Sequence, residues 1–428
     1  MGVLQKAGRA HRSAGRFLVL VEYRGVECPG EESTVVMVRC GFHQQHAVNL
    51  GGMDTHNAIL PYRGRIGVAT VITCRYCRGH RLSRVLDVGS VPAADFFPLA
   101  ATGPFDDAVY PLAMMLCADC ALAQLEVDDT HTEEPKAVEP QALRDQAADA
   151  VRAVEAAGLL TGDTVHEFTS PHGGSWLDLF VPKGFDIASD EPADLVLDSF
   201  GMMHDPDQAD AIRARARRTS TDGVLLLQFH SIATVLALGQ WNSLRHGHFA
   251  YYSLTVVCRM LADVGMSAVA VWEFDLYGGT LLVAARHGEH PAPPSVRRAL
   301  AREKAIGAAD PAGFEGLRQT VDEQVRRLAE WLSGMRSAGH SVYAYGAPSR
   351  AVALFHRAGL TTESVVAVAD ASAAKQGRRM PGTDIPIVSP ADLVAARPDQ
   401  VLLTLPDLYT EVHRRFPELD GRWMTGLC

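Results

Sequence analysis

Four of the eight cysteines form two Cys-x-x-Cys pairs, Cys74 with Cys77 and Cys117 with Cys120. Thiolates bind zinc tetrahedrally at about 2.3 Å, and two such pairs brought together by a hairpin or a short sheet supply four sulfur ligands. A redox site needs only one pair, so the duplication favours a structural metal over redox chemistry and over unrelated thiols. A zinc ion with four sulfur ligands has no open position for catalysis.

The residues between the two pairs must form the elements that bring them together. Residues 85–88 and an apolar run at 110–116 could form strands that present both pairs. We therefore expect a zinc-binding module over residues 71–135. Residues 1–70 show no sustained periodicity apart from a possible strand at 17–23, and they are left as an unassigned extension.

From residue 140 onward, short β-like runs alternate with helical stretches, which indicates an α/β fold built from crossover units. A proline-punctuated stretch at 290–294 divides this part into expected domains over 140–289 and 295–428. In the first we expect strands at 165–168, 195–198, 224–229 and 280–285, and helices at 140–158, 207–218 and 253–264. In the second we expect helices at 321–339 and 348–358, and strands at 341–345, 364–369 and 400–405.

The bulk composition limits the classes of partner that the protein is expected to bind. The formal net charge is -10 without a Lys/Arg-rich block, which argues against nucleic acid as a partner. No apolar run approaches the roughly 20 residues of a membrane span, and the amino terminus does not resemble a signal peptide. We expect a cytoplasmic protein whose cysteines stay reduced or bind metal.

Three segments, in order over residues 73–428, resemble C-methyltransferases that act on nucleotide-linked 4-keto-deoxysugars in antibiotic sugar pathways. The first contains CRYC, LDVGSVPAADFF and YPLAMMLCADCALAQL; the second contains RHGHFAYYSL and YGGTLLV; the third contains YGAPSRA and VADASAAKQGRRMPGTDIPI. The resemblance implies a zinc-binding module, a Rossmann-like S-adenosylmethionine (SAM) domain and a carboxy-terminal Rossmann-like α/β domain. It also implies a thymidine-diphosphate (dTDP) sugar between the last two.

The methyl-donor site implied by the resemblance is altered. Such a site needs a glycine-rich turn after the first strand and an acidic residue at the end of the second. The family's turn resembles E-x-G-S-N-D-G, whereas residues 167–173 read EFTSPHG, so that Thr169 replaces a glycine and Pro171 removes a backbone donor. The candidates that remain for cofactor binding are Glu167, Gly173, Gly174 and, as the ribose acid, Asp186.

The second strand of this domain is followed too closely by the next. Residues 184–188 precede the strand at 195–198 almost directly, whereas parallel neighbours normally need a crossover of a dozen or more residues. We expect one β-α unit, which would wall the adenosine pocket, to be missing.

Methylation beside a ketone needs a base to remove the carbon-bound proton, and histidine suits this role near neutral pH. The family carries Tyr-His-Glu-His where residues 245–248 read RHGH, so His248 is retained as the candidate base. His204 matches a second family histidine. Both have structural alternatives: His248 as a helix-entry or core histidine, and His204 as part of a surface Asp-Pro turn.

The turn of Tyr345 and Gly346 is expected to follow a strand and open a helix, where backbone donors face an anion such as pyrophosphate. Packing alone could also explain it, and Asp370, at the end of the next strand, would suit a dinucleotide ribose. The candidate substrate-binding residues are Arg245, Tyr345, Gly346, Arg350 and Lys375.

Three functions remain open. The departures fall on the methyl-transfer motifs, which favours NADPH-dependent 4-ketoreduction of a dTDP-linked 4-keto-deoxysugar. The alternatives are SAM-dependent C-3 methylation of the same substrate class and a catalytically inactive homologue that binds a sugar nucleotide. The expected cofactors are structural zinc and either NADPH or SAM.

Overall fold

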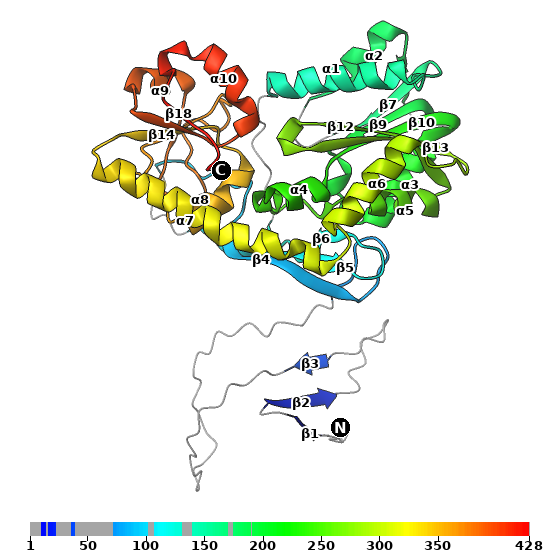
Figure 1. Cartoon of the computed structure of the whole chain (residues 1–428), viewed down its shortest axis with the longest axis horizontal. Coiled ribbons are helices and arrows are strands. Elements are labelled where there is room, and N and C mark those ends of the chain that lie inside the picture. The colour runs from blue at the N-terminus through cyan, green and yellow to red at the C-terminus, as the bar shows by residue number, and fades with distance from the viewer. Residues whose placement is uncertain are drawn as a thin grey trace, which may run out of the picture. The chain divides into compact units, whose positions relative to one another are not determined.

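The computed structural model describes residues 10–13, 16–22, 36–38, 72–101, 107–130, 139–169, 174–189 and 191–427. The chain divides into two units, Met1–Val71 and Ile72–Cys428 (Figure 1). In the first unit, β1 (Ala10–Ser13), β2 (Arg16–Glu22) and β3 (Val36–Val38) form an antiparallel sheet. The strand expected at 17–23 corresponds to β2.

The cysteine pairs lie on a small antiparallel sheet with the order β11-β6-β5-β4. The expected strands are parts of β4 (Leu82–Pro92) and β5 (Val109–Cys117), and β6 (Ala123–Leu125) follows a tight turn. The fourth strand, β11 (Ala250–Tyr251), comes from far along the chain and pairs antiparallel with β6. The zinc sheet thus incorporates the residues that directly follow the RHGH motif.

The central domain has a six-stranded sheet with the order β12-β13-β10-β9-β7-β8. β8, β7, β9 and β10 run parallel, and β13 is antiparallel to β10 and β12. The four expected strands are β7, β9, β10 and β13. The bounds are β7 (Thr164–Phe168), β8 (Asp186–Ile187), β9 (Ala193–Ser199), β10 (Thr219–His230), β12 (Met266–Phe274) and β13 (Thr280–His287).

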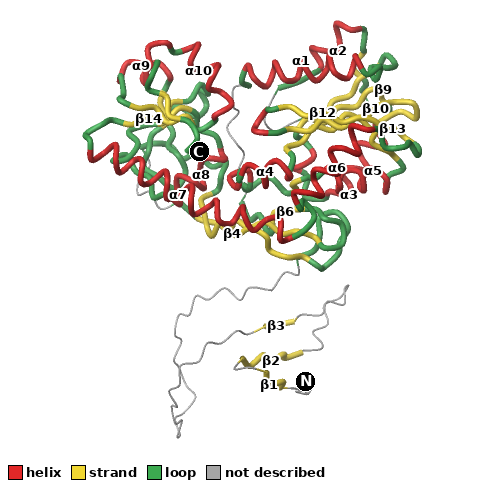
Figure 2. The backbone as a smooth tube through the Cα atoms, in the orientation of Figure 1, coloured by secondary structure: helices red, strands yellow, loops and turns green. Residues whose placement is uncertain are grey.

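Helices cover both faces of this sheet (Figures 1 and 2). On one face lie α1 (Gln141–Ala156) and α2 (Leu177–Phe180); on the other lie α3 (Gln208–Arg218), α5 (Leu254–Asp263) and α6 (Pro294–Ile306). Leu195 and Leu197 of β9 pack with the α1 side, and Val196 between them packs with the other. The centre of this strand is buried on both faces, which explains its run of three apolar residues, Leu195–Leu197.

The passage from β8 to β9 is short, as the sequence indicates. Residues 188–192 connect the two strands, and no helix is present in the described part of this link. Both strands pair with β7, since Asp186 lies opposite Thr164 and Leu195 opposite Val165. β8 is the edge strand of the described sheet, so the expected β-α unit beyond it is missing there.

The carboxy-terminal sheet is parallel, with the order β16-β15-β14-β17-β18. The helix expected at 348–358 is a 3₁₀ turn, Ser349–Ala351, followed by a six-residue α8, and the strand expected at 364–369 is limited to β15. The bounds are β14 (Val342–Tyr345), β15 (Val368–Ala369), β16 (Ile387–Val388), β17 (Gln400–Leu403), β18 (Trp423–Met424), α7 (Glu315–Ser337), α8 (Val352–Arg357), α9 (Pro390–Ala396) and α10 (Tyr409–Arg415).

Two helices link the domains. α4 (Ile232–Leu238) follows β10 and shares a core with α7 and the zinc sheet, and α6, beyond the boundary expected at 290–294, packs against β12 and α5. None of the helices in the described ranges combines the length and apolar character needed to cross a membrane.

Candidate active site

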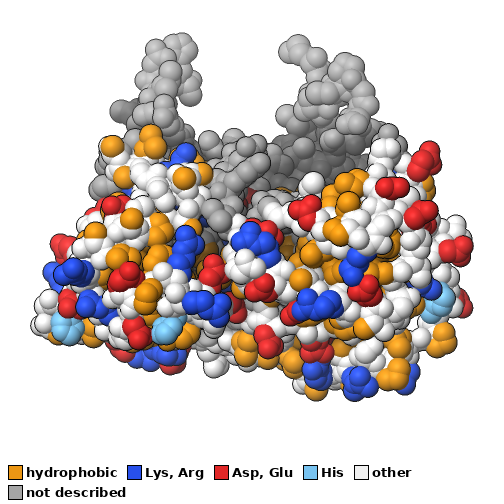
Figure 3. Space-filling model, turned by 90° about the horizontal axis from the view of Figure 1, so that it is seen from above, with side chains coloured by type: hydrophobic (Ala, Val, Ile, Leu, Met, Phe, Trp, Pro, Cys, Tyr) orange, Lys and Arg blue, Asp and Glu red, His pale blue; other side chains and the backbone are white. Residues whose placement is uncertain are grey.

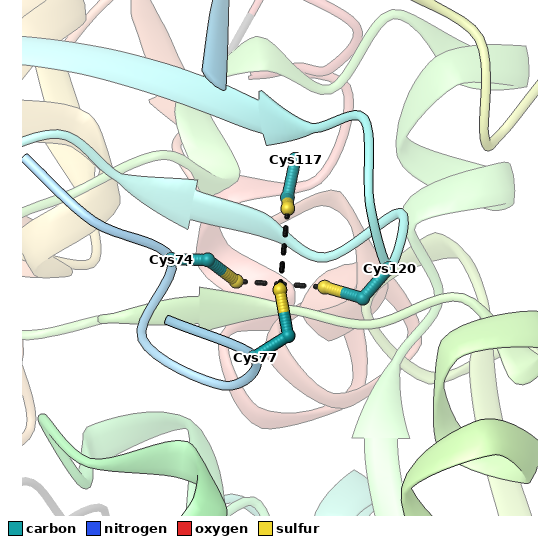
Figure 4. A group of neighbouring side chains, drawn as sticks. All are labelled: Cys74, Cys77, Cys117 and Cys120. Atoms are coloured by element: carbon teal, nitrogen blue, oxygen red, sulfur yellow. Dashed lines mark hydrogen bonds between the residues drawn. The ribbon is translucent and has the colours of Figure 1, made fainter. Parts of the chain in front are cut away.

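The four predicted zinc ligands gather at one point (Figure 4). Their sulfur atoms lie within 4.8 Å of one another, with Sγ of Cys74 3.4 Å from that of Cys120 and Sγ of Cys77 3.6 Å from that of Cys117. Cys74 and Cys77 precede β4, and the other two flank the turn between β5 and β6. Four convergent, largely buried thiols fit one tetrahedral zinc ion with no open position.

A cavity of about 290 Å³ lies at the carboxyl ends of β9, β10 and β14 and is lined by both Rossmann-like domains. Ligands of open parallel sheets bind at these ends. Six of the sequence-predicted residues line it together: Arg245, His248, Tyr345, Gly346, Arg350 and Lys375.

The two predicted histidines form a close pair beside this cavity. The ring centroids of His204 and His248 are 4.7 Å apart, with the ring planes nearly perpendicular. His204 ends a 3₁₀ turn, Met202–His204, and the amide of Phe249 donates to the carbonyl of Met203 at 2.8 Å. This backbone bond fixes the two imidazole-bearing segments side by side.

Arg245 touches His248 directly. Its Nε–H donates to Nε2 of the imidazole at 2.8 Å, so a neutral ring carries its proton on Nδ1. Nη1 of Arg245 lies 2.8 Å from Oδ1 of Asp95, and the arginine side chain is only 7% exposed. The guanidinium expected to contact substrate is therefore shared between an imidazole and a carboxylate. Sequence reasoning did not single out Asp95 within the LDVGSVPAADFF segment, because a local motif does not show a contact with a residue 150 positions away.

The cavity wall has an excess of positive charge although the chain is acidic overall. Burial and the nearby charge of Arg350 lower the pKa of the cavity-lining His230 to about 3, so this imidazole adds no charge at neutral pH. An excess of cations suits an anionic ligand. Five cations, Arg144, Arg245, Arg350, Lys375 and Arg415, face three acids, Glu139, Asp370 and Glu411. On the molecular face that Figure 3 shows, by contrast, acidic and basic side chains are interspersed.

Two strained aromatic residues line the cavity. Phe200 and Tyr277 have left-handed backbone conformations, with φ of +61° and +54°. Their rings are arranged edge to face, with the ring centroids 6.1 Å apart. Such a conformation costs a non-glycine residue about 1–3 kcal/mol, and strain of this kind gathers at functional sites. Tyr277 opens the YGGT motif that the sequence singled out.

The predicted turn after β14 has the backbone approach that requires glycine. Gly346 has φ of +91°, and a Cβ there would lie 2.6 Å from Oγ1 of Thr404. The Asp370 carboxylate accepts hydrogen bonds from the amides of Ala347 and Ser372, each at 2.7 Å. Both oxygens of the Asp370 carboxylate thus already accept backbone hydrogen bonds, whereas a dinucleotide would require this carboxylate to bind its ribose. Nζ of Lys375 also donates into this turn, to the carbonyl of Ala347 at 2.9 Å.

The end of β7 and the turn after it carry two of the predicted cofactor-binding residues, Glu167 and Gly174. Gly174 has φ of +80°, and a Cβ there would collide with the carboxylate of Glu139. Glu167 accepts from Oγ of Ser175 at 2.5 Å and from the amide of Trp176 at 2.8 Å, and burial raises its pKa. Gly173 lies outside the described residues. The close backbone approach and the acid at the strand end fit a donor bound at this turn.

The predicted ribose acid is elsewhere. Asp186 is exposed and pairs with Thr164 at the start of β7, whereas the turn follows Phe168 at its end. Four residues of strand separate these positions by about 13 Å. The described residues therefore fit a methyl donor at β7, but Asp186 does not reach the ribose position.

The fold and the site define a mixed α/β protein in which a zinc-binding module accompanies two Rossmann-like domains with a shared cavity. A family described as "C-methyltransferase C-terminal domain" matches residues 275–426, and one described as "Putative zinc binding domain" matches residues 74–132. The C-methyltransferase NovU of Streptomyces niveus is 26% identical over 418 residues, which cover 84% of this chain and 96% of NovU. The chain thus contains a zinc-binding domain and a carboxy-terminal domain of the kinds found in C-methyltransferases, and it is similar to NovU along most of its length.

Solved structures match a smaller part. Magnesium protoporphyrin IX methyltransferase of Synechocystis, with bound SAH, has 13% identity and a TM-score of 0.26 over 35% of this chain and 84% of its own. The 1,6-didemethyltoxoflavin-N1-methyltransferase of Burkholderia thailandensis has 12% identity and a TM-score of 0.28 over 39% of this chain and 96% of its own.

Proposed function

We propose that this protein is a SAM-dependent C-methyltransferase that acts beside the ketone of a nucleotide-linked 4-keto-deoxysugar. The observation that carries the proposal is the cavity in which His248, paired with His204 beside it, faces a cationic wall formed by both domains. The family matches favour this reaction over the NADPH-dependent ketoreduction that the altered motifs favoured. The dTDP group and the deoxysugar rest on the sequence resemblance.

The chain's own residues would perform the proton chemistry. His248 takes the proton from the carbon beside the ketone. Its Nε2 lone pair is covered by Arg245 in the structure, so the Nε–H of Arg245 must turn from the imidazole to the ketone oxygen. That movement frees the base and places positive charge where the enolate develops. His204, at 4.7 Å from His248, is a candidate to relay the proton onward.

Binding would divide between the domains. The cationic side chains of Arg350 and Arg415 would face the diphosphate, beside the turn of Gly346. Glu167 and Gly174 would hold SAM at the turn after β7, and SAM, when bound, supplies an electrophilic methyl group. In this proposal residues 71–135 are the zinc module, 140–289 the methyl-transfer domain and 295–428 the nucleotide-sugar domain.

The test is incubation with a dTDP-4-keto-2,6-dideoxysugar plus SAM, NADPH or both, followed by mass analysis. We expect the mass of one methyl group to appear only with SAM, and His248→Gln to abolish it. His290→Gln, at an exposed position outside the cavity, is the control and should leave the yield unchanged. A gain of two hydrogens with NADPH alone would establish reduction instead, and an unaltered substrate in every mixture would exclude both reactions.

A further inference from the structure

The RHGH segment is fixed to the zinc module by every one of its first three residues. Arg245 pairs with Asp95, and Nε2 of His246 lies 3.2 Å from the carbonyl of Pro111 on β5. The amide of Gly247 donates to Oδ2 of Asp128 at 2.6 Å. Asp95, Pro111 and Asp128 all belong to the expected zinc module, so His248 projects into the cavity from a loop seated on that module.

The backbone of the segment is adapted to this seat. Gly247 has φ of +83°, and a Cβ there would lie 3.3 Å from Oδ2 of Asp95. Glycine, where the family resemblance has glutamate, thus lets the loop turn and lets the carboxylate approach Arg245. Immediately afterwards, Ala250 pairs with Gln124 and Tyr251 with Ala123, as β11 joins the zinc sheet.

From these contacts we infer that Asp95 is a positioning residue of the reaction centre, supplied by the zinc module and acting on His248 through Arg245. The Asp95 carboxylate is 15% exposed and holds one end of a buried guanidinium whose other end meets the imidazole. Because a buried, charged guanidinium held at Nη1 and at Nε has few alternative positions in this wall, its anchor decides where its Nε–H points. The inference rests on the proposed function for its kinetic consequence alone.

The kinetic test is a double-mutant cycle with Asp95→Asn, Arg245→Gln and both. Asn keeps the shape and one acceptor but removes the charge. We expect kcat to fall by up to about 100-fold in Asp95→Asn, with KM for the sugar nucleotide little changed, because displacement of reacting groups by an ångström costs that much. If Asp95 acts through Arg245, the double variant should be no slower than Arg245→Gln. Losses that multiply would overturn the inference.

A second measurement does not depend on turnover. Long-range proton–nitrogen spectra of chains labelled with ¹⁵N-histidine report which ring nitrogen carries hydrogen, and His248→Gln identifies the resonance. Both Asp95→Asn and Arg245→Gln should shift the His248 ring nitrogens in the same direction. Asp129→Asn, an exposed acid beside Asp128, should leave them in place. Unmoved His248 signals in a folded Asp95 variant would exclude the link.

Folding is checked by the melting temperature and the zinc content of each variant. If Asp95→Asn does not fold, Arg245→Gln alone still tests whether the guanidinium sets the His248 signals, and Asp95→Glu tests the anchor with its charge retained. A wild-type chain without turnover but with coupled histidine signals would sink the proposed reaction and leave the positioning role standing.

Discussion

His230, at the end of β10, makes the cavity wall sensitive to acid. Burial, reinforced by the charge of Arg350, lowers its pKa to about 3, far below the usual value near 6.5. Above pH 6.5 the imidazole is neutral in both the folded and the unfolded chain, so it does not affect stability. Below that pH the His230 imidazole binds a proton in the unfolded chain but stays neutral in the folded chain. Its share of stability is therefore lost as the pH falls from about 6.5 toward 3.

We predict that His230→Gln reduces this acid loss. Its side chain can still donate to Oε1 of Gln240, which His230 meets at 3.1 Å, but it does not titrate. Between pH 7 and pH 5 the free energy of unfolding of the wild type should fall by about 1–2 kcal/mol more than that of the variant, measured by urea denaturation. His290→Gln, at an exposed position, should follow the wild type. Parallel curves for wild type and His230→Gln would contradict the buried neutral state.

At the residue scale, the sequence predicts those site residues that a regular spacing or a family motif distinguishes. The cysteine pairs are local patterns, so their meeting could be foreseen, and so could the shared site of Arg245, His248 and the turn at Gly346. Asp95 lies in the LDVGSVPAADFF segment, but its role could not be predicted, because a local motif does not show which residue 150 positions away its carboxylate meets. Asp186 was misplaced because a sequence shows that a strand exists more readily than which end of its neighbour it pairs with.

Among the elements, α3 is fastened to the end of β9 by a buried ion pair. Nη2 of Arg215 lies 2.6 Å from Oδ2 of Asp198, and their side chains are 7% and 2% exposed. The other oxygen of Asp198 accepts the amides of Gly201 and Met202, at the start of the turn that carries His204. The ion pair thus couples a helix, a strand and the candidate catalytic turn.

We predict that Arg215→Ala lowers the free energy of unfolding by about 3–5 kcal/mol, because it leaves a buried carboxylate without its counter-charge. Arg213→Ala is the matched control: it removes an arginine from the same helix, but one that pairs with Asp210 at the exposed surface. Exposed pairs contribute little. Urea denaturation of both variants gives the comparison, and equal losses would show that the buried pair has no special weight.

Element types were easier to predict than their extents. The centres of β9 and β10 are buried on both faces and contain short apolar runs, residues 195–197 and 224–227, so these strands were found. β12 was missed because a bulge between Ala268 and Ala270 breaks its alternation. β15 is shorter than its apolar sequence suggests: Val366 and Ala367 each share one backbone hydrogen bond with β14, but regular strand pairing begins only at Val368. Tertiary packing decided these cases, and a local pattern does not report it.

Within residues 72–428, the zinc module packs against both of the other domains. Val85 and Leu112 of its sheet belong to the same buried cluster as Phe355 of α8, while Cys117 and Leu122 belong to the cluster beneath α3 and α5. A buried ion pair between Asp107 and Arg379, at 2.6 Å, adds a polar link to the carboxy-terminal domain. The module therefore contacts both walls of the cavity, which the motif order alone did not reveal.

Loss of the metal should consequently be felt at the cavity. Cys117 ends β5 at the turn into β6, and β6 is the strand that pairs with β11 behind the RHGH segment. We predict that Cys117→Ser reduces bound zinc from about one ion per chain to a small fraction, because a four-thiolate site loses one ligand. We also predict faster hydrogen exchange at the amides of residues 245–251, measured by mass spectrometry.

Cys258→Ser, which alters a half-buried thiol on α5 outside the cluster, should keep both the zinc and the slow exchange. Zinc loss without faster exchange in that segment would show that the sheet holds the candidate catalytic loop without its metal.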